Sequence, residues 1–378
     1  MSVLGADGKF TNPWPTWQPH TLGQLAKWWW AKEQHAWYGW LMGNEKASYE
    51  QVTAQFPVAP LDLAALGKPP SNAIQASWIG HATCLVQLDG CTFLTDPFFS
   101  QRAGPWNRLG PRRTVKCPLD VDDPQLPHID FIVISHNHYD HLDVPSVQRL
   151  HARFGQHLRW YVPLKLAVWF EALGITNVQE LDWWQEVPHP ASSLTVILTP
   201  AQHESSRLGY DRRHSLWGGF CVRGKWQRVW FAGDTGYCPV FKELGEHLGP
   251  VDLALIPIGN YRPASVMRPV HCGPSEAVQI HQDVKAKASI AIHHGTLGWD
   301  GGPMDEPRHL LKEAAAAAQL PQDTFRSVQH GAVLQFPKHQ LESTNGMLSK
   351  YKRRVELLLE AVSQWHGTMW APEYFHAE

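Results

Sequence analysis

Short apolar runs recur through the middle of the chain, and most of them are rich in β-branched or aliphatic residues. They lie at Phe131–Ile134, Leu194–Leu198, Val229–Ala232, Leu253–Pro257 and Ser289–Ile292. Runs of this length, separated by turn signals and helical patterns, are typical of buried strands in layered α/β structure. The pattern therefore predicts an α/β domain over residues 76–337.

A β-hairpin is predicted at the start of this region. The apolar-rich run Ala76–Leu88 is followed by Asp89-Gly90 and then by a second run, Cys91–Thr95, which ends at Asp96. Asp-Gly tolerates the positive φ angles that a two-residue hairpin turn requires. The two runs are therefore expected to pair as antiparallel strands.

The composition is that of a soluble globular protein, with 43% hydrophobic and 18% charged residues among 378. The net charge of -2 gives no reason to expect a nucleic-acid partner. Six cysteines without a C-x-x-C pair favour reduced thiols and a cytoplasmic location. We expect no signal peptide, because the first residues lack an apolar core, and no transmembrane helix, because no apolar run is long enough.

Three histidines and an aspartate lie within six residues directly after the run Phe131–Ile134, in His136-Asn-His-Tyr-Asp-His141. Zinc is bound in proteins by imidazole nitrogen and carboxylate oxygen, and catalytic sites keep one position open. A regular strand cannot direct all four side chains at one ion. A loop leading into a helix can direct His136 and His138 to one ion, and Asp140 and His141 to a second.

Three later runs also lead to candidate ligands, which are His203, Asp234 and His293. Ligands gathered from loops at one end of a sheet are a common way to build a metal site. His294 follows His293 directly, and neighbours at a strand end point to opposite sides, so we expect His294 to be packed or hydrogen-bonded instead. The alternative interpretation is a set of ordinary loop histidines with a helix-capping aspartate.

The order and loop placement of these seven residues resemble the metallo-β-lactamase superfamily. The resemblance implies an αβ/βα four-layer sandwich, in which two mixed sheets face each other, and two Zn²⁺ ions at one edge of the sheets. It also implies the ligand assignment: His136, His138 and His203 for one zinc; Asp140, His141 and His293 for the other; and Asp234 as the bridge.

Longer strings, spread from Lys9 to about Gly331, are similar to the N-acyl-phosphatidylethanolamine-hydrolysing phospholipase D family. They are Lys9–Trp17, Trp78–Thr83, Leu181–Trp184, Leu216–Gly218, Phe231–Pro239, Ile256–Tyr261 and Ile292–Thr296. This resemblance implies a phosphodiesterase that releases N-acylethanolamine and phosphatidic acid by attack of a zinc-activated hydroxide on phosphorus. The chain departs from that family at Glu204–Arg207 and Ala264-Ser265, which leaves the acyl-chain preference open.

Further residues are assigned to the substrate side of the site. With the resemblance, His271 is expected to face the substrate phosphate and to act with Asp140 and Asp234 in catalysis. Tyr139 and Tyr261 are candidates for a substrate pocket. Asp96 is expected to orient a ligand histidine, and His81 is interpreted as a local structural histidine.

Two flanking segments complete the division of the chain. Residues 1–75 are aromatic and interrupted by proline, with a helix predicted at about Leu22–Leu41, and residues 338–378 form an extension with a helix at about Asn345–Trp365. We expect the first segment to lie on or near the active-site side and to contact a phospholipid surface peripherally, since tryptophan favours the headgroup region. Packing of these rings against the core is the alternative. The tryptophans are Trp14, Trp17, Trp28, Trp29, Trp30, Trp37 and Trp40.

Three other functions remain open at this stage, as does assembly into a homodimer. A lactonase or another soluble phosphodiester hydrolase on the same fold would not need an apolar acyl groove. A nuclease that processes tRNA would need a strongly positive face, which the net charge of -2 disfavours. A non-enzymatic lipid-binding protein would not need the seven candidate ligands.

Overall fold

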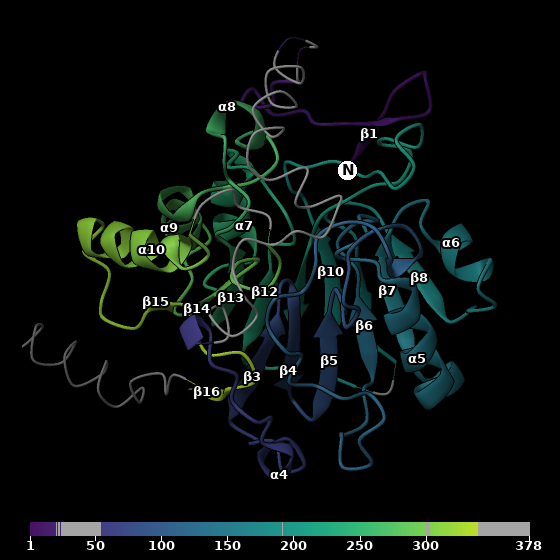
Figure 1. Ribbon diagram of the computed structural model, residues 1–378, viewed down its shortest axis with the longest axis vertical. Coiled ribbons are helices and arrows are strands. Elements are labelled where there is room, and N and C mark those ends of the chain that lie inside the picture. The colour runs from purple at the N-terminus through teal and green to yellow at the C-terminus, as the bar shows by residue number, and fades with distance from the viewer. Residues whose placement is uncertain (20, 22, 24–53, 191, 299–302, 339–378) are drawn as a thin grey trace, which may run out of the picture. The chain divides into compact units, whose positions relative to one another are not determined.

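The apolar runs form two seven-stranded mixed sheets (Figure 1). In the first sheet the order is β16-β3-β4-β5-β6-β7-β8, and in the second it is β15-β14-β13-β12-β11-β10-β9. This computed structural model describes residues 1–19, 21, 23, 54–190, 192–298 and 303–338. The predicted helices at about Leu22–Leu41 and Asn345–Trp365, with five of the seven N-terminal tryptophans, lie outside these residues.

Both sheets combine parallel and antiparallel pairs. The first consists of β16 (Val333–Pro337), β3 (Ala73–Gly80), β4 (Thr83–Leu88), β5 (Cys91–Thr95), β6 (Phe131–Val133), β7 (Arg159–Pro163) and β8 (Val178–Leu181). The second consists of β15 (Phe325–Arg326), β14 (Ser289–Ile292), β13 (Leu253–Pro257), β12 (Arg228–Phe231), β11 (Gly219–Arg223), β10 (Thr195–Thr199) and β9 (Glu186–Pro188). β5 to β8 pair in parallel, as do β12 to β15, and the remaining neighbours pair antiparallel.

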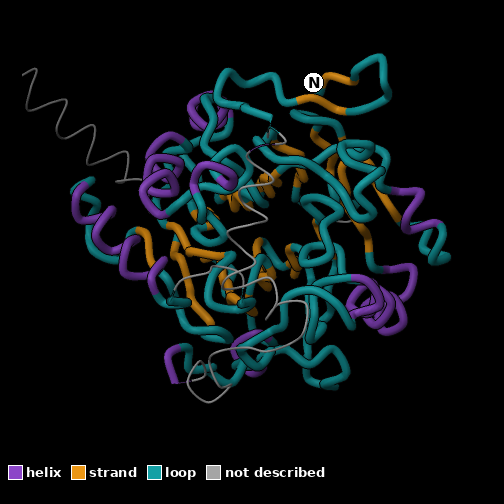
Figure 2. Tube along the Cα trace, turned by 45° about the horizontal axis from the view of Figure 1, so that its top comes forward, coloured by secondary structure: helices purple, strands orange, loops and turns teal. Residues whose placement is uncertain are grey.

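Three apolar clusters show how the layers are stacked. The central cluster joins side chains of both sheets, including Phe93, Tyr161, Phe220 and Phe231, so the two sheets face each other. The two other clusters lie on the outer faces, which helices cover (Figure 2). α5 (Val144–Phe154) and α6 (Ala167–Glu171) pack on the first sheet, and α7 (Val240–His247), α9 (Pro274–Asp283) and α10 (Glu306–Ala317) pack on the second. The predicted four-layer sandwich is confirmed.

The predicted hairpin is present, but the run Ala76–Leu88 is not one strand. Leu88 pairs with Cys91 across the turn at Asp89 and Gly90, whose φ angles are 48° and 83°. The run itself breaks at His81, where φ is 53°, and its two parts form the antiparallel pair β3 and β4. This second turn places His81 at an edge of the sheet.

The N-terminal segment contacts the second sheet where β10 ends. The Asn12 side-chain amide donates to the His203 carbonyl at 2.8 Å, and the Trp14 ring lies 5.8 Å from the Trp183 ring. Trp14 is thus partly packed on the core. The predicted boundary after residue 75 falls inside β3, which begins at Ala73, and Met1–Pro337 form one compact unit.

Two further features concern the cysteines and the length of the helices. The thiols of all six cysteines are free. Among the described residues, no helix combines the length and the apolar character that crossing a bilayer requires.

A buried histidine outside the site makes stability depend on pH. His281 in α9 bonds through Nδ1 to the Ser289 hydroxyl at 2.7 Å, and burial lowers its pKa to about 4. The unfolded chain, with a histidine pKa near 6.5, binds a proton between pH 6.5 and 4 that the folded chain does not. This contribution is therefore complete above pH 6.5 and is lost as the pH falls toward 4.

We expect His281→Gln to make the acid destabilisation shallower by up to about 1.4 kcal/mol per pH unit over that range. Urea unfolding of both proteins at pH 7, 6 and 5 measures this difference. If the free energy of unfolding falls equally with pH in the wild type and in His281→Gln, then His281 has the same pKa in the folded and unfolded states.

Candidate metal centre

The candidate ligands follow the ends of different strands that meet at one edge of the two sheets. The loop after β6 carries His136 to His141, and the segments after β10, β12 and β14 carry His203, Asp234 and His293. The loop after β6 stays irregular because α5 begins only at Val144. The Asp143 carboxylate caps that helix by accepting from the Ser146 backbone N–H. The chain before the cap is therefore free to turn its histidines inward.

One group of ligands consists of three histidines. His136 Nε2 lies 2.8 Å from His138 Nδ1, and His203 Nε2 lies 3.3 Å from the same nitrogen. All three ligand atoms lie within 4.8 Å of one another, and the rings of His136 and His203 are buried. Three imidazole nitrogens at this spacing suit one borderline cation such as Zn²⁺.

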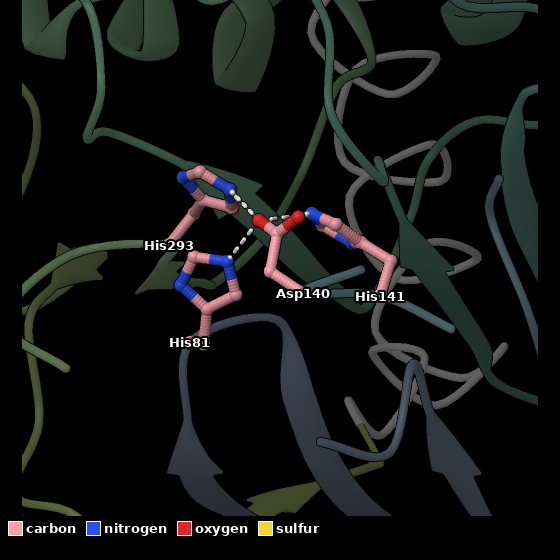
Figure 3. Close-up of side chains that lie close together, drawn as sticks. All are labelled: His81, Asp140, His141 and His293. Atoms are coloured by element: carbon pink, nitrogen blue, oxygen red, sulfur yellow. Dashed lines mark hydrogen bonds and ion pairs between the residues drawn. The ribbon is translucent and has the colours of Figure 1, made fainter. Parts of the chain in front are cut away.

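A second group surrounds the Asp140 carboxylate (Figure 3). Asp140 Oδ2 lies 2.7 Å from His81 Nε2, 3.2 Å from His141 Nε2 and 3.6 Å from His293 Nε2. All four side chains are buried; His81 directly follows β3, Asp140 and His141 lie in the β6–α5 loop, and His293 directly follows β14. This is a second set of nitrogen and oxygen donors.

The Asp234 carboxylate lies between the two groups. Its Oδ2 is 3.9 Å from the Nε2 atoms of both His136 and His203 and 3.0 Å from His141 Nε2. Its other oxygen, Oδ1, is 3.2 Å from His293 Nε2. One carboxylate thus faces both groups, which is the position expected of a bridging ligand.

Hydrogen bonds behind the rings fix which nitrogen faces the centre. His141 Nδ1 bonds to Asp96 Oδ2 at 2.6 Å, and His203 Nδ1 bonds to the Val270 carbonyl at 2.8 Å. A ring nitrogen that donates outward leaves the lone pair of the other nitrogen toward the centre. The predicted orienting role of Asp96 agrees with this contact.

The donor set fits a metal ion, because several of its buried atoms make no hydrogen bond and, among the described residues, form ion pairs only with one another. Among the described residues, His141 Nε2, His293 Nε2 and Asp234 Oδ1 make no hydrogen bond. Burying polar atoms without a partner is costly, whereas a bound cation would satisfy all three. Imidazole and carboxylate donors are those that Zn²⁺ takes in catalytic sites.

The carboxylates of the centre are held as anions. Burial alone would raise the pKa of Asp140 and of Asp234, but the neighbouring His141 keeps both pKa values well below the ordinary range. Burial would likewise lower the pKa of His293, which Asp234 and Asp140 instead raise to about 9. The same carboxylates also hold the pKa of His141 well above its ordinary value against the effect of burial, so the two anions are paired with these two histidines.

His81 is a residue that the sequence interpretation missed. It was expected to be a local structural histidine, yet its ring lies 4.0 Å from the ring of His293, besides its bond to Asp140. Burial and the charge of His293 lower the pKa of His81 to about 3, so the ring is neutral. It follows β3 directly, so the strand-end pattern that selected the other ligands also applies to it.

His271 belongs to the same cluster. Its Nδ1 lies 3.9 Å from Asp234 Oδ2, and the Asn260 side-chain amide donates to its Nε2 at 3.0 Å. Burial holds the pKa of His271 well below the ordinary value. The neutral ring therefore carries its proton on Nδ1, the nitrogen nearer to Asp234.

The two candidate pocket tyrosines differ in position. Tyr261 lines a groove beside His271 and donates to Glu306 Oε2 at 2.8 Å. Tyr139 lies under the Arg207 guanidinium, 4.0 Å from its carbon. His294 is packed as expected, with its ring stacked on Trp78 at 4.7 Å and its Nε2 3.3 Å from the Ser327 hydroxyl.

Comparison with known proteins gives consistent matches. The model of the beta-lactamase superfamily domain matches residues 92–294. N-acyl-phosphatidylethanolamine-hydrolyzing phospholipase D 1 of Caenorhabditis elegans is 42% identical over 277 residues, which cover 69% of this chain and 76% of that protein. The mitochondrial N-acyl-phosphatidylethanolamine-hydrolyzing phospholipase D of Saccharomyces cerevisiae is 33% identical over 244 residues, which cover 63% of this chain and 51% of that protein.

A solved structure supports the same fold. Isothiocyanate hydrolase from Delia radicum gut bacteria has a TM-score of 0.54 at 21% identity, over 70% of this chain and 99% of that chain. At this level of identity the match concerns the fold alone.

Proposed function

The chain belongs to the metallo-β-lactamase superfamily and, within it, to the N-acyl-phosphatidylethanolamine-hydrolysing phospholipase D family, and on that premise we propose that it hydrolyses N-acyl-phosphatidylethanolamine. The products would be N-acylethanolamine and phosphatidic acid. Its general class, a metal-dependent hydrolase, follows from the family and from the cluster of metal-binding side chains.

The position of Asp234 is the observation that carries the proposal. A carboxylate that faces two separate groups of ligands suits a centre of two zinc ions. The ligands would be His136, His138 and His203 on one side, Asp140, His141 and His293 on the other, and Asp234 between them. Two zinc ions, when bound, would activate a water for attack on phosphorus and offset the negative charge of the diester.

His271 is suited to the phosphate side of the reaction. Its Nδ1–H makes no hydrogen bond within the described part of the chain and lies beside Asp234. A neutral N–H donor can bond to a phosphate oxygen without adding charge. Asn260 holds the ring in this tautomer, so it is a positioning residue for His271.

An apolar groove favours a lipid substrate over a small soluble one. The groove, of about 600 Å³, begins at His271 and runs between α8 (Ala264–Met267), α9 and α10. Its wall is more apolar than polar and includes Leu310, Ala314 and Ala317. A small soluble phosphodiester, or a lactone without an alkyl chain, offers little to cover such a wall, whereas an acyl chain does.

Exposed apolar side chains on two loops support peripheral contact with a phospholipid surface. Leu208 and Tyr210 are 58% and 76% exposed on the loop that begins at His203. Trp106 is 83% exposed beside Asn107, whose amide donates to Asp143 at 3.1 Å. Both loops border the metal-binding loop, so we propose that the protein meets its substrate at a membrane. A cytoplasmic location stays a prediction. Assembly into a homodimer stays a prediction.

A metal count coupled to a lipid assay tests this function. Purified protein is expected to contain about two zinc ions per chain and to release N-acylethanolamine from vesicles that contain N-acyl-phosphatidylethanolamine. The same protein is assayed with a soluble phosphodiester and with a lactone, and mass spectrometry identifies the products.

Turnover of only the soluble phosphodiester or only the lactone would overturn the lipid substrate and leave the hydrolase in place. Lipid binding without any product would instead favour the non-enzymatic alternative.

A further inference from the structure

Arg207 reaches from the loop after β10 to the loop that carries the metal-binding motif. Its Nη1 donates to the Asn137 carbonyl at 3.0 Å and to the Leu142 carbonyl at 2.7 Å. Asn137 lies between His136 and His138, and Leu142 follows His141 directly. One guanidinium thus joins two points of the motif that are five residues apart.

The guanidinium is itself held in place on its other sides. Its carbon lies 4.0 Å from the centre of the Tyr139 ring and 5.5 Å from that of Trp169. The backbone N–H of Arg207 donates to both carboxylate oxygens of Asp211 at 3.0 Å. Both ends of the side chain are therefore fixed, which lowers the entropy cost of holding the motif.

The loop needs such an external donor because it lies between a strand and a helix. The carbonyls of Asn137 and Leu142 belong to neither the sheet nor α5, so neither element supplies a partner for them. The ligand atoms must lie within a few tenths of an ångström of the positions that the metal ion requires. A loop without outside support does not fix them this closely. The two N–H groups of Nη1 point in fixed directions and can serve both carbonyls, while the planar guanidinium stacks on the Tyr139 ring, which the ammonium of lysine cannot do in the same way.

We propose that Arg207 is a positioning residue that clamps the loop from His136 to His141 in the geometry that binds metal. The inference rests on the proposed metal centre. Among the described residues, Arg207 makes no hydrogen bond to a candidate ligand side chain, and its two bonds reach the backbone on either side of the ligands. Its positive charge also acts on the nearby His138, and Arg207→Lys keeps that charge. The competing view is that Arg207 supports folding in general and leaves the metal affinity unchanged.

The test compares Arg207→Met, Arg207→Lys and a matched control, Arg153→Met. Arg153, in the last turn of α5, also donates to two loop carbonyls, those of Val121 and Leu126, and its guanidinium carbon lies 5.3 Å from the Phe154 ring. Zinc affinity is measured by competition with a chelator of known affinity. Thermal unfolding is measured with and without zinc, and kcat and KM are measured on the zinc-loaded proteins.

We expect Arg207→Met to weaken zinc binding by about 10- to 100-fold, and to lower kcat more than it changes KM. Arg207→Lys should recover part of this loss, because an ammonium keeps the positive charge and the N–H donors but loses the planar stacking on Tyr139. Arg153→Met should unfold at a lower temperature while its zinc affinity stays that of the wild type.

Equal zinc affinities in Arg207→Met and the wild type would overturn the clamp, as would equal losses in Arg207→Met and Arg153→Met. If Arg207→Met does not fold, the zinc affinities of Arg207→Lys and Arg153→Met are compared instead. Equal affinities in these two variants would overturn the clamp. The zinc measurements need no substrate. If the wild type binds two zinc ions but does not hydrolyse the lipid, the proposed substrate is wrong, and the role of Arg207 is still tested by the zinc affinities. A wild type without zinc would overturn the metal centre before any variant is compared.

Discussion

Asp234→Asn is expected to lower hydrolysis by about 10³-fold or more, since each metal ion contributes several kcal/mol of charge stabilisation in the transition state. Four nitrogens of the candidate ligand histidines lie 3.0 to 3.9 Å from its two oxygens, and they belong to both groups of ligands. Asparagine has the same shape but carries no negative charge, and its NH₂ group would face a ligand nitrogen or a cation. The variant should therefore hold fewer than two zinc ions.

Asp252→Asn is the matched control for this variant. Asp252 is also buried, and it accepts from the Arg228 backbone N–H at 2.8 Å and pairs with Lys287 at 2.7 Å, at the start of β13. Its replacement should lower stability without changing the zinc content. Rates and metal contents are measured for both variants, and a wild-type rate in Asp234→Asn would contradict the bridging role.

Removal of the metal is expected to abolish hydrolysis and to lower the free energy of unfolding. A ligand that binds only the folded state stabilises it by about 4 kcal/mol when its free concentration is about 1,000 times its Kd. Asp140 and Asp234 are buried among histidines, and a bound cation would satisfy Asp234 Oδ1, which accepts no hydrogen bond from the described residues. Urea unfolding with zinc, with a chelator, and after zinc is restored measures the change.

The double variant His136→Gln/His203→Gln provides the control for non-specific effects of the chelator. It lacks two of the three nitrogens in one group, so added zinc should stabilise it less than the wild type. An unfolding free energy of the wild type that does not respond to zinc would contradict a metal centre at this edge of the sheets. Activity that survives complete removal of metal would contradict it too.

Most of the candidate ligands could be found from sequence because each follows a strand end. β13 and β14 match the predicted runs, and β6, β10 and β12 differ from them by one residue at an end or at both. His81 was missed for a local reason. The run Ala76–Leu88 has no Asp-Gly or Pro at its centre, so the turn at His81 has no strong signal, although Gly80 precedes it.

Other contacts of the site join residues far apart in the chain, and no local pattern encodes them. The bond of Asp96 to His141, the bond of His203 to the Val270 carbonyl and the bonds of Arg207 to the motif are of this kind. Each depends on which strand lies beside which and on how a loop crosses the sheet edge. Sequence identifies the types of side chain available for such bonds but not the pairs.

The sequence by itself determined the chemistry available to this protein: strands with histidine or aspartate at their ends, and therefore a capacity to bind metal. Residue type and spacing are local properties, and they suffice for that conclusion. Only the tertiary structure decided that Asp234 lies between two groups of ligands, that His81 joins one of them, and that an apolar groove begins at His271. Those relations arise when two sheets pack face to face and bring segments from opposite halves of the chain to one edge.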